Sequence, residues 1–169
     1  MLHFKLLEII LRWQLQGVDY LYDSSNYQYA SMIFISTDKS RLDIHFIYNF
    51  LKSSYWAKNI PFDMVKSIID NSMCFGLFVD NRQVGFARVV TDYTTFAYLA
   101  DVFIDPAERK KGYGKRLVLQ ILNDNRLIKL KRWHLVTKDA HLFYKKLGFS
   151  RVENGEGHMK IYKKPKYKN

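Results

Sequence analysis

The stretch that decides the fold reads Asp101-Val-Phe-Ile-Asp-Pro-Ala-Glu-Arg-Lys-Lys-Gly-Tyr-Gly-Lys-Arg116. An apolar strand runs there into a basic turn with two glycines, and the turn opens a helix. Gly112 and Gly114 carry no Cβ that would block a bulky anion, and glycine tolerates unusual φ angles. The first N–H groups of a helix are free to bind an anion, and the helix dipole points the same way. The stretch therefore predicts a phosphate-binding turn.

Five basic residues add mobile positive charge around this turn: Arg109, Lys110, Lys111, Lys115 and Arg116. A solvated basic helix start is the alternative interpretation of the same residues. The turn lacks the three glycines of the dinucleotide fingerprint and the Gly-Lys-Ser/Thr of a Walker loop. Arg-x-x-Gly-x-Gly after a strand and a proline is a third pattern.

The composition of the whole chain is that of a globular protein. Its 169 residues, 48% hydrophobic and 25% charged, suffice for one domain with a core. No apolar run reaches the roughly 18 to 20 residues of a membrane span, and Met1 to Trp13 does not read as a secretory signal. The single cysteine, Cys74, excludes an internal disulfide and fits a reducing compartment. We therefore predict a cytoplasmic protein without a membrane partner.

The net charge of +11 is concentrated in the second part of the chain. Residues 1–107 hold 9 Lys and Arg against 11 Asp and Glu, whereas residues 108–169 hold 18 against 5. Such a field would steer an anionic cofactor, and it would equally attract nucleic acid. A general lysine bias is the alternative explanation for the tail 163–168.

The chain divides into three segments. Residues 1–31 are an N-terminal extension without an assigned role. Within it, residues 2–15 predict a helix that docks on the domain or on a second copy of the chain, as in a homodimer. Met32 as the natural start is a second interpretation. Residues 32–164 form the domain, and residues 165–169 are a basic tail.

The pattern of the domain predicts about seven strands and about four helices. The expected strands are 32–37, 73–79, 83–91, 96–104, 132–137, 149–152 and 158–163. The expected helices are 41–53 with Asp38 or Ser40 as cap, 61–71, the one from the phosphate turn to about 125, and 139–147, which Gly148 ends. Short turns make the strands between 73 and 104 antiparallel, and the intervening helix makes 96–104 and 132–137 parallel.

A second motif, Ala140-His-Leu-Phe-Tyr-Lys-Lys-Leu-Gly-Phe149, follows the turn. Ala140 and Tyr144 are four residues apart and share one helix face. A core aromatic before a helix cap is the alternative for Tyr144 alone. The two motifs, in this order and separated by a helix and a strand, resemble the GNAT N-acetyltransferase superfamily. Over about residues 32–163 the chain is identified as a single-domain member of the bacterial type.

The resemblance implies the α/β (α+β) fold of this superfamily, with a mixed, mostly antiparallel sheet and splayed parallel strands four and five. It also implies acetyl-CoA as cosubstrate, whose pantetheine arm inserts between the two splayed strands. An Asn is common in the family where this chain has Thr137. By the family pattern, the cofactor contacts would come from Val102, Phe103, Ile104, Arg109, Lys110, Lys111, Gly112, Tyr113, Gly114, Lys115, Thr137, Ala140 and Tyr144.

The resemblance further implies direct acetyl transfer, in which the Val102 N–H polarises the thioester carbonyl and the Tyr144 hydroxyl protonates the leaving thiolate. Asp101 would draw off the amine proton through water or bind the ammonium group, and an ion pair with a nearby basic residue is its alternative role. His141 is a second candidate for a catalytic role, and His134 fits packing. Cys74 has no nearby partner that would make it a nucleophile. No residues show metal-ligand spacing, so we expect no metal.

We therefore expect an enzyme, an acyltransferase that moves the acetyl group of acetyl-CoA to a primary amine of a small molecule. An acetyltransferase for protein lysines or N-termini is one alternative. A basic nucleic-acid-binding module is another, although the chain has no recognised readout motif. The acceptor pocket would be built from residues 41–71 and 92–95, with Tyr48, Tyr55, Trp56 and Tyr93 as its aromatic lining.

Overall fold

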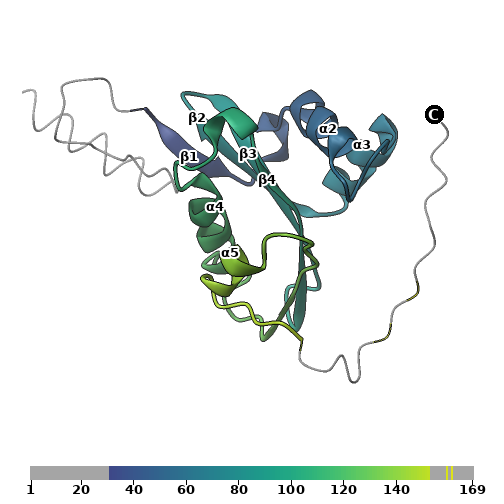
Figure 1. Ribbon diagram of the computed structural model, residues 1–169, viewed down its shortest axis with the longest axis vertical. Coiled ribbons are helices and arrows are strands. Elements are labelled where there is room, and N and C mark those ends of the chain that lie inside the picture. The colour runs from purple at the N-terminus through teal and green to yellow at the C-terminus, as the bar shows by residue number, and fades with distance from the viewer. Residues whose placement is uncertain (1–30, 153–158, 160, 162–169) are drawn as a thin grey trace, which may run out of the picture.

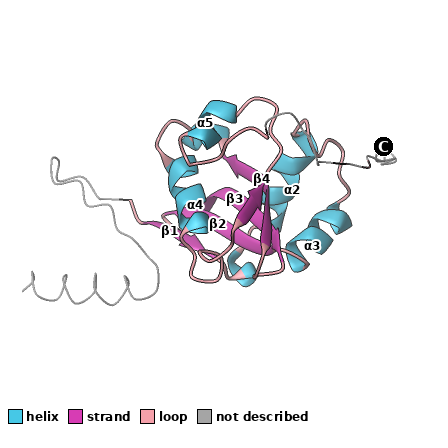
Figure 2. Ribbon diagram, turned by 90° about the horizontal axis from the view of Figure 1, so that it is seen from below, coloured by secondary structure: helices cyan, strands magenta, loops and turns pink. Residues whose placement is uncertain are grey.

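The sheet at the centre of the molecule has five strands in the order β1-β2-β3-β4-β5. The computed structural model describes residues 31–152, 159 and 161. Helices α2 and α3 cover one face of the sheet, and α4 and α5 lie on the other (Figures 1 and 2). The strands are β1 (Ile33–Ser36), β2 (Met73–Val79), β3 (Arg82–Thr91), β4 (Phe96–Ile104) and β5 (Arg132–His134). The helices are α2 (Ile44–Ser53), α3 (Phe62–Asp70), α4 (Tyr113–Leu122) and α5 (His141–Lys145).

The strand pairing follows the lengths of the connections. Strands β1 to β4 are antiparallel neighbours, as the short turns predict. Asp80 and Asn81 form the β2–β3 turn with φ of 49° and 65°, which suits the right-handed twist of a hairpin. Strand β5 runs parallel to β4, which confirms the prediction from the intervening helix.

Two hydrophobic clusters hold the layers together, because alternate residues of each strand face opposite sides. On one side Phe75, Leu77 and Val89 pack with Leu117 and Ile121 of α4. On the other side the buried residues come from α2, α3 and the sheet: Leu42, Ile47, Leu51, Ile60, Val65, Ile69, Cys74, Phe86 and Phe103. No helix in the described part of the chain has the length and hydropathy of a membrane span.

The prediction of seven strands is wrong for the described residues, which form five. Residues 149–152 are not a strand, because the Phe149 N–H donates to the Tyr144 carbonyl at 3.1 Å and ties the chain to the end of α5. Gly148, with φ of 93°, follows that helical segment as predicted, but α5 spans His141–Lys145 rather than 139–147. The expected helix at 2–15, the basic tail 165–169 and most of the strand at 158–163 lie outside the described residues.

Three other predicted boundaries need correction. Asp43 caps α2 by accepting from the Phe46 N–H, whereas Asp38 caps a separate 3-10 turn, Lys39–Arg41. Helix α4 ends at Leu122 rather than near 125. Strand β5 ends at His134 rather than at Thr137, because the chain diverges from β4 beyond that point.

Candidate active site

The predicted phosphate-binding turn, residues 105–112, connects β4 to α4, and we call it the phosphate turn. Its backbone is the one that Gly112 predicts. The 3-10 turn Pro106–Glu108 follows β4, and Asp105 caps it by accepting from the Ala107 N–H. Lys110 and Gly112 have φ of 66° and 82°, and α4 begins directly after Gly112. A Cβ added at Gly112 would meet nothing within 4 Å, so the space beside Gly112, just before α4, is open. This is the arrangement that binds anions at a helix start.

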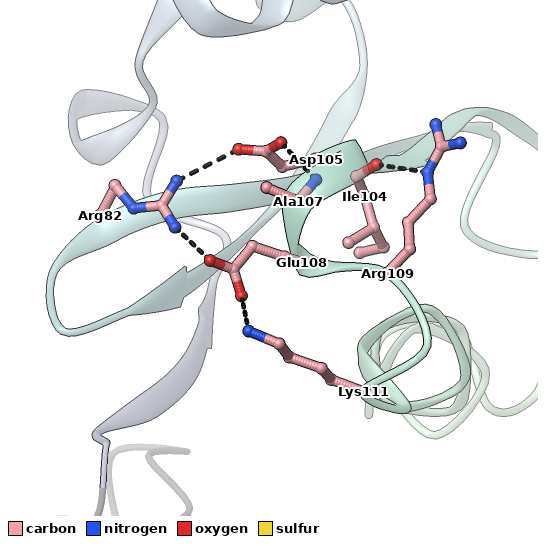
Figure 3. A network of polar contacts seen from close by, with 7 residues as sticks. All are labelled: Arg82, Ile104, Asp105, Ala107, Glu108, Arg109 and Lys111. Carbon is pink, nitrogen blue, oxygen red and sulfur yellow. Dashed lines mark hydrogen bonds and ion pairs between the residues drawn. The ribbon is translucent and has the colours of Figure 1, made fainter.

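A network of charged side chains fixes the outer side of this turn (Figure 3). Arg82, at the start of β3, contacts Asp105 at 3.2 Å and also pairs with Glu108. The Lys111 ammonium group lies 2.7 Å from Glu108 Oε2. The hydrogen bond from Lys111, together with the charges of Lys111 and Arg82, lowers the pKa of Glu108. Lys111 is therefore engaged with the turn itself.

The other basic residues of the turn have different surroundings. Arg109 donates from Nε to the Ile104 carbonyl at 3.2 Å. Arg116 donates to the Ile33 carbonyl at 3.3 Å and so ties α4 to β1. Gly112, Lys115, Arg116 and Gln120 line a hollow of about 340 Å³ beside α4. Lys110 and Lys115 are exposed, which leaves them accessible to an anion at the turn.

A β-bulge interrupts β4 just before the turn. Phe86 of β3 faces Phe103, but Arg88 faces Ala100, so β4 carries one extra residue between these pairs. Asp101 lies in the bulge with φ of 51°. The bulge reverses the side-chain alternation. Ala97 and Leu99 face α4 before it and Ile104 after it, whereas Phe103 faces α2 and α3.

The Asp101 carboxylate is bonded on both oxygens. Arg88 Nε lies 2.5 Å from Oδ2, and the Trp56 indole N–H donates to Oδ1 at 2.9 Å. Arg88 also donates to the hydroxyl of Ser72 at 3.2 Å. The side chains of Arg88 and Asp101 are 18% and 8% exposed, so this ion pair is largely removed from water. The ion-pair alternative proposed for Asp101 is thus present, and its catalytic role stays a prediction.

The strands β4 and β5 separate beyond their third paired residues, Tyr98 and His134. Within the described residues, no strand lies against the outer edge of β4 from Leu99 to Ile104. That edge includes Val102, Phe103 and Ile104, three of the predicted cofactor residues. An exposed strand edge offers N–H and C=O groups to an extended ligand.

Two aromatic side chains of the α2–α3 loop cross the opening between the diverging strands, and we call Tyr55 and Trp56 the aromatic bridge. Trp56 is bonded to Asp101 of β4, and the Lys138 backbone N–H, beyond β5, donates to the Tyr55 hydroxyl at 3.1 Å. The two rings meet edge to face with centroids 4.9 Å apart. The loop therefore contacts both sides of the opening.

The second motif lies beside this opening. Thr137 Oγ1 accepts from the Ala140 N–H at 3.0 Å, so the residue that replaces the common Asn shapes the turn into α5. Tyr144 is half-buried, with Phe143 and Phe149 in edge-to-face contact. Burial, and then the charges of Tyr55 and Asp139, raise the pKa of Tyr144 to about 12. Its hydroxyl thus remains a hydrogen-bond donor across the physiological pH range.

Proteins similar to this chain are found among the acetyltransferases. Residues 70–151 match the acetyltransferase (GNAT) domain. A Gibberella zeae protein whose name assigns it provisionally to the acetyltransferases is 34% identical over 146 residues, which cover 73% of this chain and 82% of the relative. The chain belongs to the GNAT acetyltransferases.

Two solved structures are similar to this GNAT acetyltransferase. A Xanthomonas campestris protein, provisionally assigned to the GNAT family, has a TM-score of 0.77 at 44% identity, with 81% of this chain and 97% of that chain covered. An aminoglycoside N-acetyltransferase in complex with CoA has a TM-score of 0.56 at 18% identity, with coverages of 82% and 99%, and supports the fold alone.

GNAT acetyltransferases use acetyl-CoA, and the residues present here fit it. The open space before α4 and the basic turn suit the phosphates, and the unpaired edge of β4 suits an extended arm. The described residues contain no group of His, Cys, Asp and Glu that would hold a metal ion. Cys74 is buried, and burial raises the pKa of its thiol to about 11, which disfavours a nucleophilic thiolate.

The remaining candidates from the sequence fall at different places. His134 packs against Phe96 with ring centroids 5.4 Å apart, and His141 is exposed at the start of α5. Tyr48 packs edge to face on Phe62. Tyr93 lies in the β3–β4 turn, eight residues before Asp101 and at the opposite end of β4 from Ile104. Of the four suggested lining aromatics, only the aromatic bridge contacts the opening in this way.

Sequence reasoning missed Arg88 and Arg82. A signal for Arg88 was present, since one charged residue within the apolar run Val84 to Val90 indicates a buried partner. For Arg82 the sequence contains no such signal, because nothing near it in the chain shows that the start of β3 lies against residues 105–108.

Proposed function

We propose that this enzyme transfers the acetyl group of acetyl-CoA to a primary amine of a small molecule. The observation that carries the proposal is the bulge at Asp101, which lies between the anion-binding turn and the opening of the sheet. Acetyl-CoA supplies the acetyl group as a thioester, whose C–S bond breaks as the amine forms an amide. Fixing both reactants in one opening supplies much of the rate enhancement.

The turn and the edge of β4 hold the two halves of the cosubstrate. In this proposal Lys110, Gly112, Gly114 and Lys115 hold the phosphates, and the backbone of Val102 to Ile104 bonds the extended arm. The Val102 N–H is directed at the thioester oxygen, where negative charge develops. A preorganised donor at that position is commonly a large catalytic contribution.

Tyr144 serves as the donor for the departing sulfur. A phenol with a pKa of about 12 keeps its proton at neutral pH. A thiol has an ordinary pKa near 8.5, so full proton transfer from this phenol to the thiolate is uphill. Tyr144 therefore acts chiefly by hydrogen bonding to the thiolate as it leaves, and bulk water completes the protonation.

The attacking amine loses its proton to water in this scheme. Both oxygens of Asp101 already accept hydrogen bonds from Arg88 and Trp56. Hydrogen bonds of this kind stabilise an ionised carboxylate and make it a weaker base. In this proposal Asp101 stays bonded to Arg88 and Trp56 and does not take up the proton itself.

The aromatic bridge favours a small amine over a protein substrate. An extended peptide would need an open channel along the acceptor side of the opening. Here the loop with Tyr55 and Trp56 lies across that side, with hydrogen bonds to Asp101 of β4 and to Lys138 beyond β5. A cytoplasmic location and a second copy of the chain as partner stay predictions from the sequence.

Thermal unfolding with acetyl-CoA tests the cosubstrate. At about 100 times Kd, binding should stabilise the protein by about 2.7 kcal/mol. Duplex DNA is the comparison ligand: a shift with DNA and none with acetyl-CoA would support the nucleic-acid alternative. A panel of small amines and lysine-containing peptides, assayed by thiol release, then identifies the acceptor. Turnover with peptides alone would replace the small-molecule proposal by the protein-acetylating one.

A further inference from the structure

The aromatic bridge and the bulge are connected by a network of hydrogen bonds, one ring contact and an ion pair. It begins at the Lys138 N–H, which donates to Tyr55, and continues through the Tyr55–Trp56 ring contact to Asp101. From Asp101 it passes to Arg88 of β3. The Lys138 ammonium group also lies over the Tyr55 ring, 5.8 Å from its centroid. The network thus connects β4 to the segment after β5 through the α2–α3 loop, at a point where β4 and β5 are no longer paired.

The backbone of Asp101 needs such support. A non-glycine residue in the left-handed region is unfavourable by about 1 kcal/mol or more, and it persists only where its surroundings hold it there. Asp101 has φ of 51°, and both of its carboxylate oxygens accept hydrogen bonds from side chains of other segments. These two hydrogen bonds hold the side chain of the one bulge residue whose backbone is left-handed.

We infer that Trp56, Tyr55, Asp101 and Arg88 are positioning residues for the acetyl transfer. They hold the bulge and fix the spacing of β4 from the segment after β5, and so direct the Val102 N–H toward the thioester. This inference rests on the proposed function. It assigns to Asp101 an action through the backbone of its own strand, in place of proton abstraction.

The two roles for Asp101 give different expectations for its variants. Asparagine adopts the left-handed region more readily than most residues, and its carbonyl oxygen still accepts from Trp56 or Arg88. It cannot act as a base. A positioning role therefore predicts that Asp101→Asn retains most of the acetyl-CoA affinity that Asp101→Ala loses, whereas a base role predicts unchanged acetyl-CoA affinity for both variants.

Binding measured by calorimetry tests the inference without a known acceptor. Each variant is titrated with acetyl-CoA and with 3′-phospho-ADP, the nucleotide part that lacks the pantetheine arm. Trp56 is 43% exposed, and Trp56→Phe keeps an aromatic ring there but removes the N–H donor. The loss of a partly exposed hydrogen bond to a carboxylate should weaken acetyl-CoA binding about fivefold. Binding of 3′-phospho-ADP should stay unchanged, because the phosphate turn lies outside the network.

A matched pair of tyrosines controls for the loss of a hydroxyl. Tyr55 and Tyr93 are each 54% exposed, and only Tyr55 contacts the opening. Tyr55→Phe should weaken acetyl-CoA binding selectively, and Tyr93→Phe should change neither ligand. Asp101→Ala should have the largest selective effect, with Asp101→Asn closer to the unsubstituted protein.

The outcomes separate this inference from the proposed function. If the unsubstituted protein binds neither ligand, the acetyl-CoA proposal itself fails. If it binds both, but Trp56→Phe and Asp101→Ala weaken both ligands equally or neither, the positioning role is overturned. An Asp101→Asn variant as weak as Asp101→Ala would also overturn it, because the effect would then depend on charge rather than on bulge geometry.

Discussion

The phosphate turn and the bulge are adjacent in the chain and both depend on charged side chains, yet they are stabilised differently. Arg82 of the turn network is 57% exposed, whereas Arg88 and Asp101 at the bulge are largely buried. Exposed ion pairs contribute little because water and salt screen them. A buried charge that loses its partner is strongly unfavourable. The turn should therefore tolerate changes to its side chains, and the bulge should not.

The stability of the two networks gives the largest expected difference. Arg88→Ala leaves the Asp101 carboxylate largely buried without its ion pair and should lower the free energy of unfolding by about 2 to 3 kcal/mol. Urea unfolding of the variant and of Arg82→Ala measures the contrast. Equal losses for the two arginines would contradict the distinction between the regions.

Acetyl transfer beside the bulge should depend on Tyr144, whose loss should not affect cofactor binding at the phosphate turn. Tyr144→Phe removes the proposed donor to sulfur and should lower kcat about 100-fold, with little change in the Kd of acetyl-CoA. Unchanged kcat would reduce Tyr144 to a packing residue.

The pH profile adds a second measurement on Tyr144. Its pKa is raised to about 12, so the donor persists while the free amine accumulates with rising pH. In the unsubstituted enzyme, kcat/KM should rise into the alkaline range, and no descending limb should appear near the ordinary tyrosine pKa of about 10. A limb at that pH that disappears in Tyr144→Phe would show that burial does not protect the hydroxyl.

The backbone of the turn should matter more than its side chains. Gly112→Ala meets no atom within 4 Å but places a Cβ at φ of 82°, so the strain should weaken acetyl-CoA binding about tenfold. Gly148→Ala is the matched control, with φ of 93° and the same open space outside the turn. It should lower stability to a similar extent while the Kd of acetyl-CoA is unchanged. Equal binding losses would assign the effect to general destabilisation.

Acid should remove the small contribution of the turn network. The pKa of Glu108 is lowered, mainly by the hydrogen bond from Lys111. A carboxyl group with a lowered pKa stabilises the fold above its unfolded value of 4.5 and loses that contribution as the pH falls through the folded value. The Tm difference between Arg82→Ala and the unsubstituted protein should therefore be small near pH 7 and decrease further as the pH falls below 4.5. A difference that persists in acid would place the effect of Arg82 elsewhere.

The sequence predicts the turn better than the bulge for a physical reason. Gly112, Gly114 and the basic residues lie within one short segment, and a local backbone requirement appears directly as glycine. The sheet order of β2, β3 and β4 is equally local, because short turns connect these strands. The bulge depends on Trp56, Arg88 and Asp101, which come from three elements, and a one-residue shift of register leaves no local mark on an apolar strand. The sequence also does not show that β5 ends at His134, because the strand propensity of residues 135–137 is as high as that of residues 132–134.

The bulge also bears on how the strand could be redesigned. Counting the paired residues themselves, β3 has five residues from Gly85 to Val89, and the facing part of β4 has six from Leu99 to Ile104. Deleting one residue there would restore an uninterrupted ladder and a uniform alternation of side chains. A sequence optimised for stability alone would omit the extra residue. In this enzyme β4 contains the extra residue, and we attribute to it the shape of the opening beside the strand.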